Sequence, residues 1–178
     1  MKAYKLLMKV HKVEKYAALA TSAMREAYNG KEVVEIIREQ ANINIDIIDG
    51  KTEAAIIAST DLHYLLATDK AYLYVDVGGG STEFSFFADG KQIASRSFKI
   101  GTVRLLNEMV NEVVWHEIEK WIKTVTEDFE NVSMIGSGGN INRLFKMSGK
   151  LQEKPLSYMY MNSQYAYLNS LSYEQRMQ

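Results

Sequence analysis

The stretch from Tyr72 to Phe87 constrains the fold of this chain most strongly, because two apolar runs meet there at three consecutive glycines. The first run ends at Asp76, and Glu83 stands at the start of the second. Such runs are typical of strands, and glycine allows the positive φ angles of a sharp turn. Glycine amides can also surround phosphate oxygens. A tight hairpin with a solvated acidic rim is the alternative interpretation, and a short motif alone leaves both open.

The polar residues around this turn have the chemistry of a phosphate site. Ser81 and Thr82 offer hydroxyl donors directly after the glycines. Asp76 and Glu83 offer carboxylate oxygens, which are the ligands that Mg²⁺ prefers, and which can also position a water molecule. The residues at this turn could therefore bind phosphate or Mg²⁺, in addition to joining two strands.

Composition narrows the classes of function. A chain of 178 residues can form one substantial core or two small lobes. The net charge of −1 gives no support for non-specific nucleic-acid binding, which needs a basic surface. The absence of cysteine excludes disulfides, thiolate metal sites and a cysteine nucleophile. No apolar run has the length of a membrane span or signal peptide, so we expect a soluble, cytoplasmic protein without membrane or nucleic-acid partners.

Apolar periodicity predicts a mixed α/β chain. Three strands separated by turns between residues 72 and 100 indicate an antiparallel meander. A helix begins near Thr102, and a longer amphipathic helix follows over residues 112–128, with Trp115 and Trp121 as packing anchors. Upstream, the pattern predicts helices over residues 1–15, 21–27, 32–40 and 51–66, and strands over residues 16–20 and 44–49.

Two of the upstream helices carry candidate charged residues, and one of these helices could bind an anion. Arg25 lies in the helix predicted over residues 21–27, and Glu53 lies in the first turn of a helix capped by Thr52. A helix N-terminus and an arginine both favour negative charge, so the first of these helices could bind an anion. The alternatives are a simple capped helix with Arg25 on its surface, and a Glu53 that only complements the helix dipole.

A second glycine-rich segment follows a strand predicted over residues 132–135. It consists of Gly136, Ser137, Gly138 and Gly139, and it opens a helix. This arrangement can place amides and the positive end of a helix at a phosphate. It lacks the Gly-Lys-Ser/Thr ending of a P-loop and the full dinucleotide-binding spacing, and close helix–strand packing is an alternative reason for the glycines.

Together these segments resemble the exopolyphosphatase / guanosine pentaphosphate phosphohydrolase (Ppx/GppA) family of the actin-like ATPase superfamily. The resemblance rests on Asp76-Val-Gly-Gly-Gly-Ser-Thr-Glu83, on Thr21-Ser-Ala-Met-Arg25 and on the Gly-Ser-Gly-Gly segment, and it extends over nearly the whole chain. It implies an RNase H-like fold, with a mixed sheet whose three-strand meander is flanked by helices. It also implies two lobes, of which residues 1–66 form the last part of lobe one, including the interlobe helix, and residues 67–178 form most of lobe two.

The resemblance implies a role for each candidate residue. Glu53 is expected to be the catalytic base for the attacking water, although Thr52 stands where the family has a further acid. Asp76 and Glu83 match acids that act with Mg²⁺ and the water, and Arg25 matches an arginine that contacts phosphate. The phosphate loop is matched by Gly78, Gly79, Gly80, Ser81 and Thr82, and the loop opposite it by Gly136, Ser137, Gly138 and Gly139.

One family motif has no counterpart in this sequence. The family begins with an Asp-x-Gly-Ser-Asn-Ser hairpin that forms its first phosphate loop, and nothing here resembles it. We therefore expect a fragment with impaired activity. Its lobe-one sheet would have an open edge, which favours pairing with another chain, as in a homodimer.

The implied function is a hydrolase that releases terminal phosphate from polyphosphate or guanosine pentaphosphate by metal-assisted attack of water. Such chemistry needs charge neutralisation and an aligned water more than covalent catalysis. A non-catalytic, actin-like module that binds nucleotide or phosphate for regulation is the alternative. A sugar- or acetate-kinase relative is disfavoured by Glu53 and by the Gly-Gly-Gly-Ser-Thr-Glu form of the loop.

Overall fold

The computed structural model describes residues 1–61, 70–151 and 154–176. The chain divides into two compact units, residues 1–136 and residues 137–178. The predicted lobe boundary at residue 66, and the last part of the helix predicted over residues 51–66, lie outside the described residues. That boundary stays a prediction.

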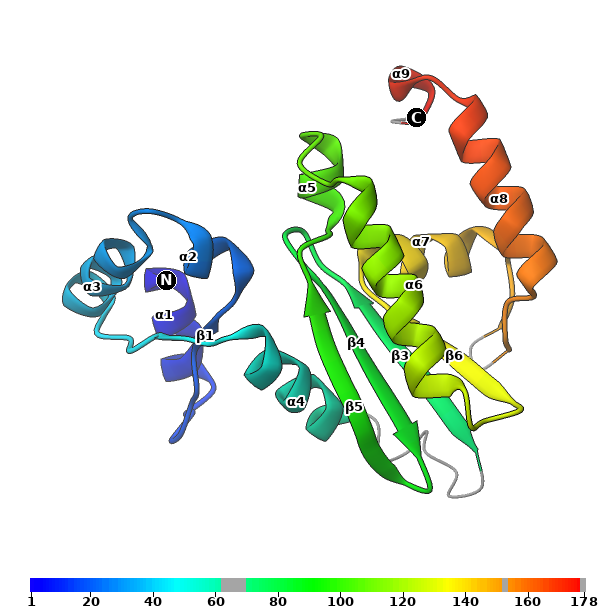
Figure 1. The fold of residues 1–178 in the computed structure, drawn as a ribbon. Coiled ribbons are helices and arrows are strands. Elements are labelled where there is room, and N and C mark those ends of the chain that lie inside the picture. Colours follow the sequence, from blue (N-terminus) through cyan, green and yellow to red (C-terminus); the bar gives the residue numbers. More distant parts are fainter. Residues whose placement is uncertain (62–69, 152–153, 177–178) are drawn as a thin grey trace. The chain divides into compact units, whose positions relative to one another are not determined.

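A four-stranded sheet forms the centre of the first unit, with the strand order β5-β4-β3-β6 (Figure 1). Its strands are β3 (Ala71–Val77), β4 (Thr82–Ala88), β5 (Lys91–Phe98) and β6 (Val132–Ser137). β3, β4 and β5 pair antiparallel, which confirms the predicted meander. Asp89 and Gly90 join β4 to β5 with φ angles of 51° and 70°, and this left-handed pair suits the right-handed twist of a hairpin.

One face of the sheet packs against helix α6 (Glu112–Thr126) and forms the main core (Figure 1). The Trp121 ring lies 6.1 Å from the rings of both Phe84 and Phe98 in edge-to-face contacts. The prediction that Trp121 anchors this helix is confirmed. For Trp115 the same prediction is wrong, because its side chain remains 46% exposed. Asn111 caps the helix by accepting a hydrogen bond from the Val114 amide at 3.2 Å.

The opposite face of the sheet carries helix α4 (Gly50–Asp61), which packs against β4 and β5. A Cβ at Gly50 would lie 2.6 Å from the Cβ of Ser97, so only glycine allows the helix to start this close to β5. The predicted cap of this helix was wrong by three residues. Asp49 Oδ1 accepts from the Thr52 amide at 2.7 Å, and Thr52 itself lies inside the helix.

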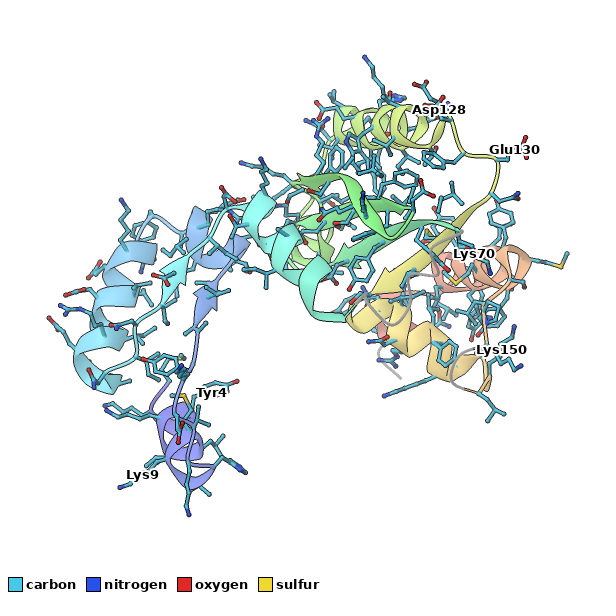
Figure 2. The ribbon with its side chains drawn as sticks, turned by 90° about the horizontal axis from the view of Figure 1, so that it is seen from below. Tyr4, Lys9, Lys70, Asp128, Glu130 and Lys150 are labelled. Atoms are coloured by element: carbon cyan, nitrogen blue, oxygen red, sulfur yellow. The ribbon has the colours of Figure 1, made fainter. Side chains whose placement is uncertain are left out.

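The N-terminal part is built from short elements. They are α1 (Lys2–Val10), β1 (Leu19–Ala20), α2 (Ser22–Glu26), α3 (Gly30–Ala41) and β2 (Asp46–Ile47). β1 and β2 form a parallel pair, so both predicted strands exist but are shorter than their apolar patterns suggested. Helix α1 has no buried residue, and Tyr4 and Lys9 project from it (Figure 2).

The first unit also contains α5 (Thr102–Leu106) among its described helices. The second unit contains α7 (Gly139–Met147), α8 (Tyr158–Ser170) and α9 (Tyr173–Arg176). Within it, the Tyr160 hydroxyl donates to the Leu144 carbonyl at 3.5 Å and links α8 to α7. Among the described residues, no helix combines the length and the apolar character that crossing a bilayer requires.

Replacing Phe86 by alanine should destabilise the first unit by about 3–5 kcal/mol, because it leaves a cavity at a fully buried position. The Phe86 side chain is 0% exposed and its ring lies 5.0 Å from that of Phe129. Urea denaturation of both proteins measures the difference. Ile93→Ala is the matched control, since Ile93 is 56% exposed on β5 and its loss should change stability by about 0.5 kcal/mol or less. Equal effects of the two substitutions would contradict this account of the core.

Candidate phosphate site

The register of β3 and β4 brings Asp76 and Glu83 together. The two residues are direct partners across the antiparallel pair, so their side chains leave the same face of the sheet. Between the strands, the Gly78 amide donates to the Ser81 carbonyl at 3.0 Å and closes the turn. The segment is therefore a hairpin with two acids side by side at its end, but the acidic rim of the alternative interpretation is not solvated at Glu83, which is buried.

The carbonyl groups of the glycine turn are held by the start of helix α5. The Thr102 amide donates to Gly78 O at 3.0 Å, and the Val103 amide donates to Gly79 O at 2.9 Å. A peptide unit is planar and trans, so holding its C=O on one side directs its N–H to the other. The amides of Gly79 and Gly80 are directed in this way, and they have no acceptor among the described residues. Amides so arranged can bind an anion.

The two hydroxyl groups that follow the glycines have different partners. Thr82 is buried, and its Oγ1 donates to the Ile100 carbonyl at 2.7 Å. That proton is therefore used to hold the loop to the backbone beyond β5. The Ser81 side chain lies near enough to Glu83 to oppose the rise of its pKa, and Ser81 also lines a cleft. Of the predicted hydroxyl donors, Ser81 is the one placed to meet a ligand.

Glu83 is a buried carboxylate in an acidic neighbourhood. It is only 3% exposed, and Ser97 Oγ donates to its Oε1 at 3.0 Å. Burial raises the pKa of Glu83 above its usual range, and the negative charges of Glu53 and Asp76 raise it further. Hydrogen bonds from Ser81 and Ser97 oppose this pKa shift without cancelling it. Glu53 and Asp76 are thus both close enough to Glu83 to repel its charge.

Arg25 and Glu53 form an ion pair that the sequence did not predict. Arg25 lies on α2 and Glu53 in the first turn of α4, and Arg25 Nη1 lies 3.5 Å from Glu53 Oε2. The same nitrogen donates to the Ile48 carbonyl at 2.6 Å, which fixes the guanidinium beside the acid. Both of these contacts use Nη1, so the other edge of the fork can face an anion.

A cleft of about 350 Å³ lies beside these groups and is rich in cations. Ser81 and Arg25 line it, but Glu53, Asp76 and Glu83 are not among the described residues of its wall. The charged and polar residues that complete the wall are Glu26, Lys51, Ser95, Arg96, Ser97 and Lys99, together with Gly50. Arg25, Lys51 and Lys99 against one acid make this cleft suited to an anionic ligand, whereas the Arg96 guanidinium pairs with Glu117 of α6.

Sequence reasoning missed three of these cations: Lys51, Arg96 and Lys99. A signal for Lys99 was present, since alternate residues of a strand share a face and Lys99 follows Ser97 by two positions. No comparable signal existed for Arg96, whose Nη2 pairs with Glu117 at 3.0 Å and whose guanidinium lies over the Phe98 ring. Lys51 enters the wall only because α4 starts so close to β5.

The second glycine-rich segment has the predicted local structure. It joins β6 to α7, and Gly138 has a φ of 109°, a backbone angle that residues with a side chain rarely adopt. Gly136 belongs to the first compact unit, and Ser137 and Gly139 belong to the second. A Cβ at Gly139 would meet no atom of the described chain within 4 Å, so close packing does not explain that glycine. Its position opposite the first loop stays a prediction.

Comparison with known proteins by sequence gives three findings. The family model of the Ppx/GppA phosphatase family matches residues 1–175. Exopolyphosphatase 1 of Mycobacterium leprae is 29% identical over 91 residues, which are 51% of this chain and 27% of that protein. The guanosine-5'-triphosphate,3'-diphosphate pyrophosphatase of Photobacterium profundum is 33% identical over 93 residues, which are 52% of this chain and 18% of that protein.

Solved structures agree in fold. An exopolyphosphatase from Cytophaga hutchinsonii superposes with a TM-score of 0.79 at 22% identity, over 99% of this chain and 64% of that one. The Aquifex aeolicus member of the Ppx/GppA family gives a TM-score of 0.69 at 24% identity, over 98% of this chain and 62% of that one. The predicted α/β fold with a mixed sheet is confirmed, and the chain spans less than two thirds of these relatives. Since the family model covers almost the entire sequence, the chain belongs to the Ppx/GppA phosphatase family.

Proposed function

We propose that this chain carries the site of a phosphoanhydride hydrolase that releases the terminal phosphate of inorganic polyphosphate or guanosine pentaphosphate. One observation carries the proposal: Arg25, which contacts Glu53, lines the same cation-rich cleft as Ser81 of the glycine loop. The names of two relatives, an exopolyphosphatase and a guanosine polyphosphate pyrophosphatase, support this substrate class. A cytoplasmic location and pairing into a homodimer stay predictions.

The glycine loop and Arg25 would bind the terminal phosphate. The amides of Gly79 and Gly80 donate to its oxygens, and Arg25 neutralises part of its charge from the other side. Lys51 and Lys99 line the same cleft and offset the charge of the following phosphates. The terminal phosphorus is then fixed for attack by water.

Glu53 is the proposed general base. Its carboxylate takes a proton from water while the water oxygen bonds to the terminal phosphorus and the bridging P–O bond breaks. The electron pair of that bond leaves with the shortened phosphate chain. The contact with Arg25 holds the Glu53 carboxylate in one orientation, and a bound phosphate would share that cation.

The donor set also fits a divalent cation. Glu83 and the two acids that repel its charge supply the hard oxygen ligands that Mg²⁺ prefers, and a cation would relieve the raised pKa of Glu83. In the described part of the chain, no group of three or more acids or histidines has the spacing of a metal site. Mg²⁺ commonly takes one or two carboxylates and completes its shell with water and substrate phosphates, so Asp76 and Glu83 suffice to hold it. When bound, it would neutralise charge that develops on the phosphoryl oxygens.

A non-catalytic phosphate-binding module is the second candidate. It is favoured by the lack of a three-acid metal group among the described residues. Both candidates share the cleft and the glycine loop. They differ in whether Glu53 acts as the general base for hydrolysis of the bound phosphate chain.

Replacing Glu53 by glutamine distinguishes the two candidates. The enzyme reading predicts that phosphate release from inorganic tripolyphosphate falls by about 10²- to 10⁴-fold, because the amide cannot accept the proton of water. Phosphate release and tripolyphosphate affinity are measured on the same preparation. Glu35→Gln is the control, since Glu35 is exposed on α3 and pairs with Arg38. Binding without measurable release in the unmodified chain, with or without added Mg²⁺, would favour the module.

Glu83 should make stability depend on pH. Its pKa in the folded chain is raised above the usual 4.5, so the protonated form favours folding. The contribution of Glu83 to the free energy of unfolding is therefore fully present below about pH 4.5. It is lost as the pH rises through the raised pKa of Glu83. Glu83→Gln should remove this component, as measured by urea denaturation between pH 4.5 and 7.5.

Added Mg²⁺ provides the control for that measurement. At neutral pH it should stabilise the unmodified chain more than Glu83→Gln, because the ion offsets repulsion among ionised acids. Identical pH profiles for the two proteins would contradict the electrostatic account of Glu83. Equal stabilisation by Mg²⁺ would contradict the assignment of Glu83 as a ligand.

A further inference from the structure

The side chain of Arg104 joins three elements of the first unit. It leaves helix α5, its Nε donates to the Gly80 carbonyl at 2.5 Å, and its Nη2 forms an ion pair with Glu26 of helix α2. Only 14% of the Arg104 side chain is exposed. The planar guanidinium can hold both partners at once because its donors point in fixed directions.

Helix α2 approaches the glycine loop at its start and is linked to it at its end through Arg104. At its start, a Cβ on Gly80 would collide with the Ser22 hydroxyl, so the two backbones approach closely there. At its end, Glu26 pairs with Arg104, while the adjacent Arg25 turns to Ile48 and Glu53. The element that carries Arg25 is thus attached to the loop through Arg104.

The hydrogen bond from Arg104 to the Gly80 carbonyl fixes the direction of the Ser81 amide. The Gly80 carbonyl and the Ser81 amide belong to one planar, trans peptide unit, so their C=O and N–H point in opposite directions. The α5 backbone holds the carbonyls of Gly78 and Gly79, and Arg104 holds the third, that of Gly80. This third anchor orients the amide of Ser81, a residue that lines the cleft.

We infer that Arg104 is a positioning residue, which directs the Ser81 amide into the phosphate site and fixes Arg25 relative to the glycine loop. Glu26 neutralises the Arg104 charge and completes the link to α2. The inference rests on the proposed function only because it takes the Ser81 amide and Arg25 to be groups that bind phosphate. The mechanical link itself involves Arg104, Gly80 and Glu26 and needs no ligand.

Nuclear spin relaxation of the ¹⁵N-labelled 178-residue chain tests the link without substrate. In the unmodified chain, the amides of Gly80 and Ser81 should have order parameters of about 0.85, and in Arg104→Gln these should fall below about 0.6. Arg104→Lys should give an intermediate value, because one ammonium cannot satisfy both partners in the same geometry. Arg38→Gln removes an exposed arginine that pairs with Glu35 and should leave both amides rigid.

A second variant separates the two halves of the link. Glu26→Gln removes the ion pair to α2 but keeps the bond to Gly80, so it should leave the Ser81 amide rigid while shifting the Arg25 Nε resonance. Inorganic tripolyphosphate is the binding probe, and Arg104→Gln should weaken its affinity at least tenfold, more than Glu26→Gln does.

Two results would overturn the inference. In the first, the amides of Gly80 and Ser81 stay as rigid in Arg104→Gln and Arg104→Lys as in the unmodified chain. In the second, both variants lose rigidity throughout β4, which would mean that Arg104 stabilises the sheet in general rather than the glycine loop. A chain that binds no tripolyphosphate would refute the proposed function but would leave the relaxation result as a valid test of the link.

Discussion

The antiparallel register of β3 and β4 places Asp76 opposite Glu83, and the other parts of the candidate site are arranged around that pair. The register is fixed by burial, because a slip of one residue would turn Phe84 and Phe86 out of the core. The apolar face of the sheet thereby decides where the acids on the opposite face lie. Packing against α6 and the placement of the carboxylates are two results of one constraint.

Electrostatic strain is concentrated on the face of the sheet that carries Asp76 and Glu83. Glu83 is buried near two other acids, which raises its pKa and disfavours the ionised form. Such an arrangement lowers stability unless a cation or protons compensate it, and clustered, perturbed acids are characteristic of functional sites. Arg25 pairs with Glu53, one of these acids, whereas Arg104 hydrogen-bonds the glycine loop and has its own charge balanced by Glu26.

The sequence predicted the parts of this site that local patterns encode. The meander follows from alternating apolar runs, and the choice of Arg25, Glu53 and the glycine loop as candidate site residues follows from family motifs. Patterns could not show which atoms hold the loop, because the contacts of Arg104 with Gly80 and Glu26 join positions 24 and 78 residues apart. Likewise, Thr82 has the same chemistry as Ser81 in sequence, and only the fold shows its hydroxyl bonded to Ile100.

The central claim is that the glycine loop and Arg25 together form one phosphate site. Titration of the ¹⁵N-labelled chain with inorganic tripolyphosphate, followed by ¹H–¹⁵N correlation spectra, tests it most directly. The account predicts saturable shifts of the Gly79, Gly80 and Ser81 amides and of Arg25 Nε, all with one dissociation constant. Saturable shifts elsewhere with an unchanged glycine loop, or no saturable shift at all, would contradict it.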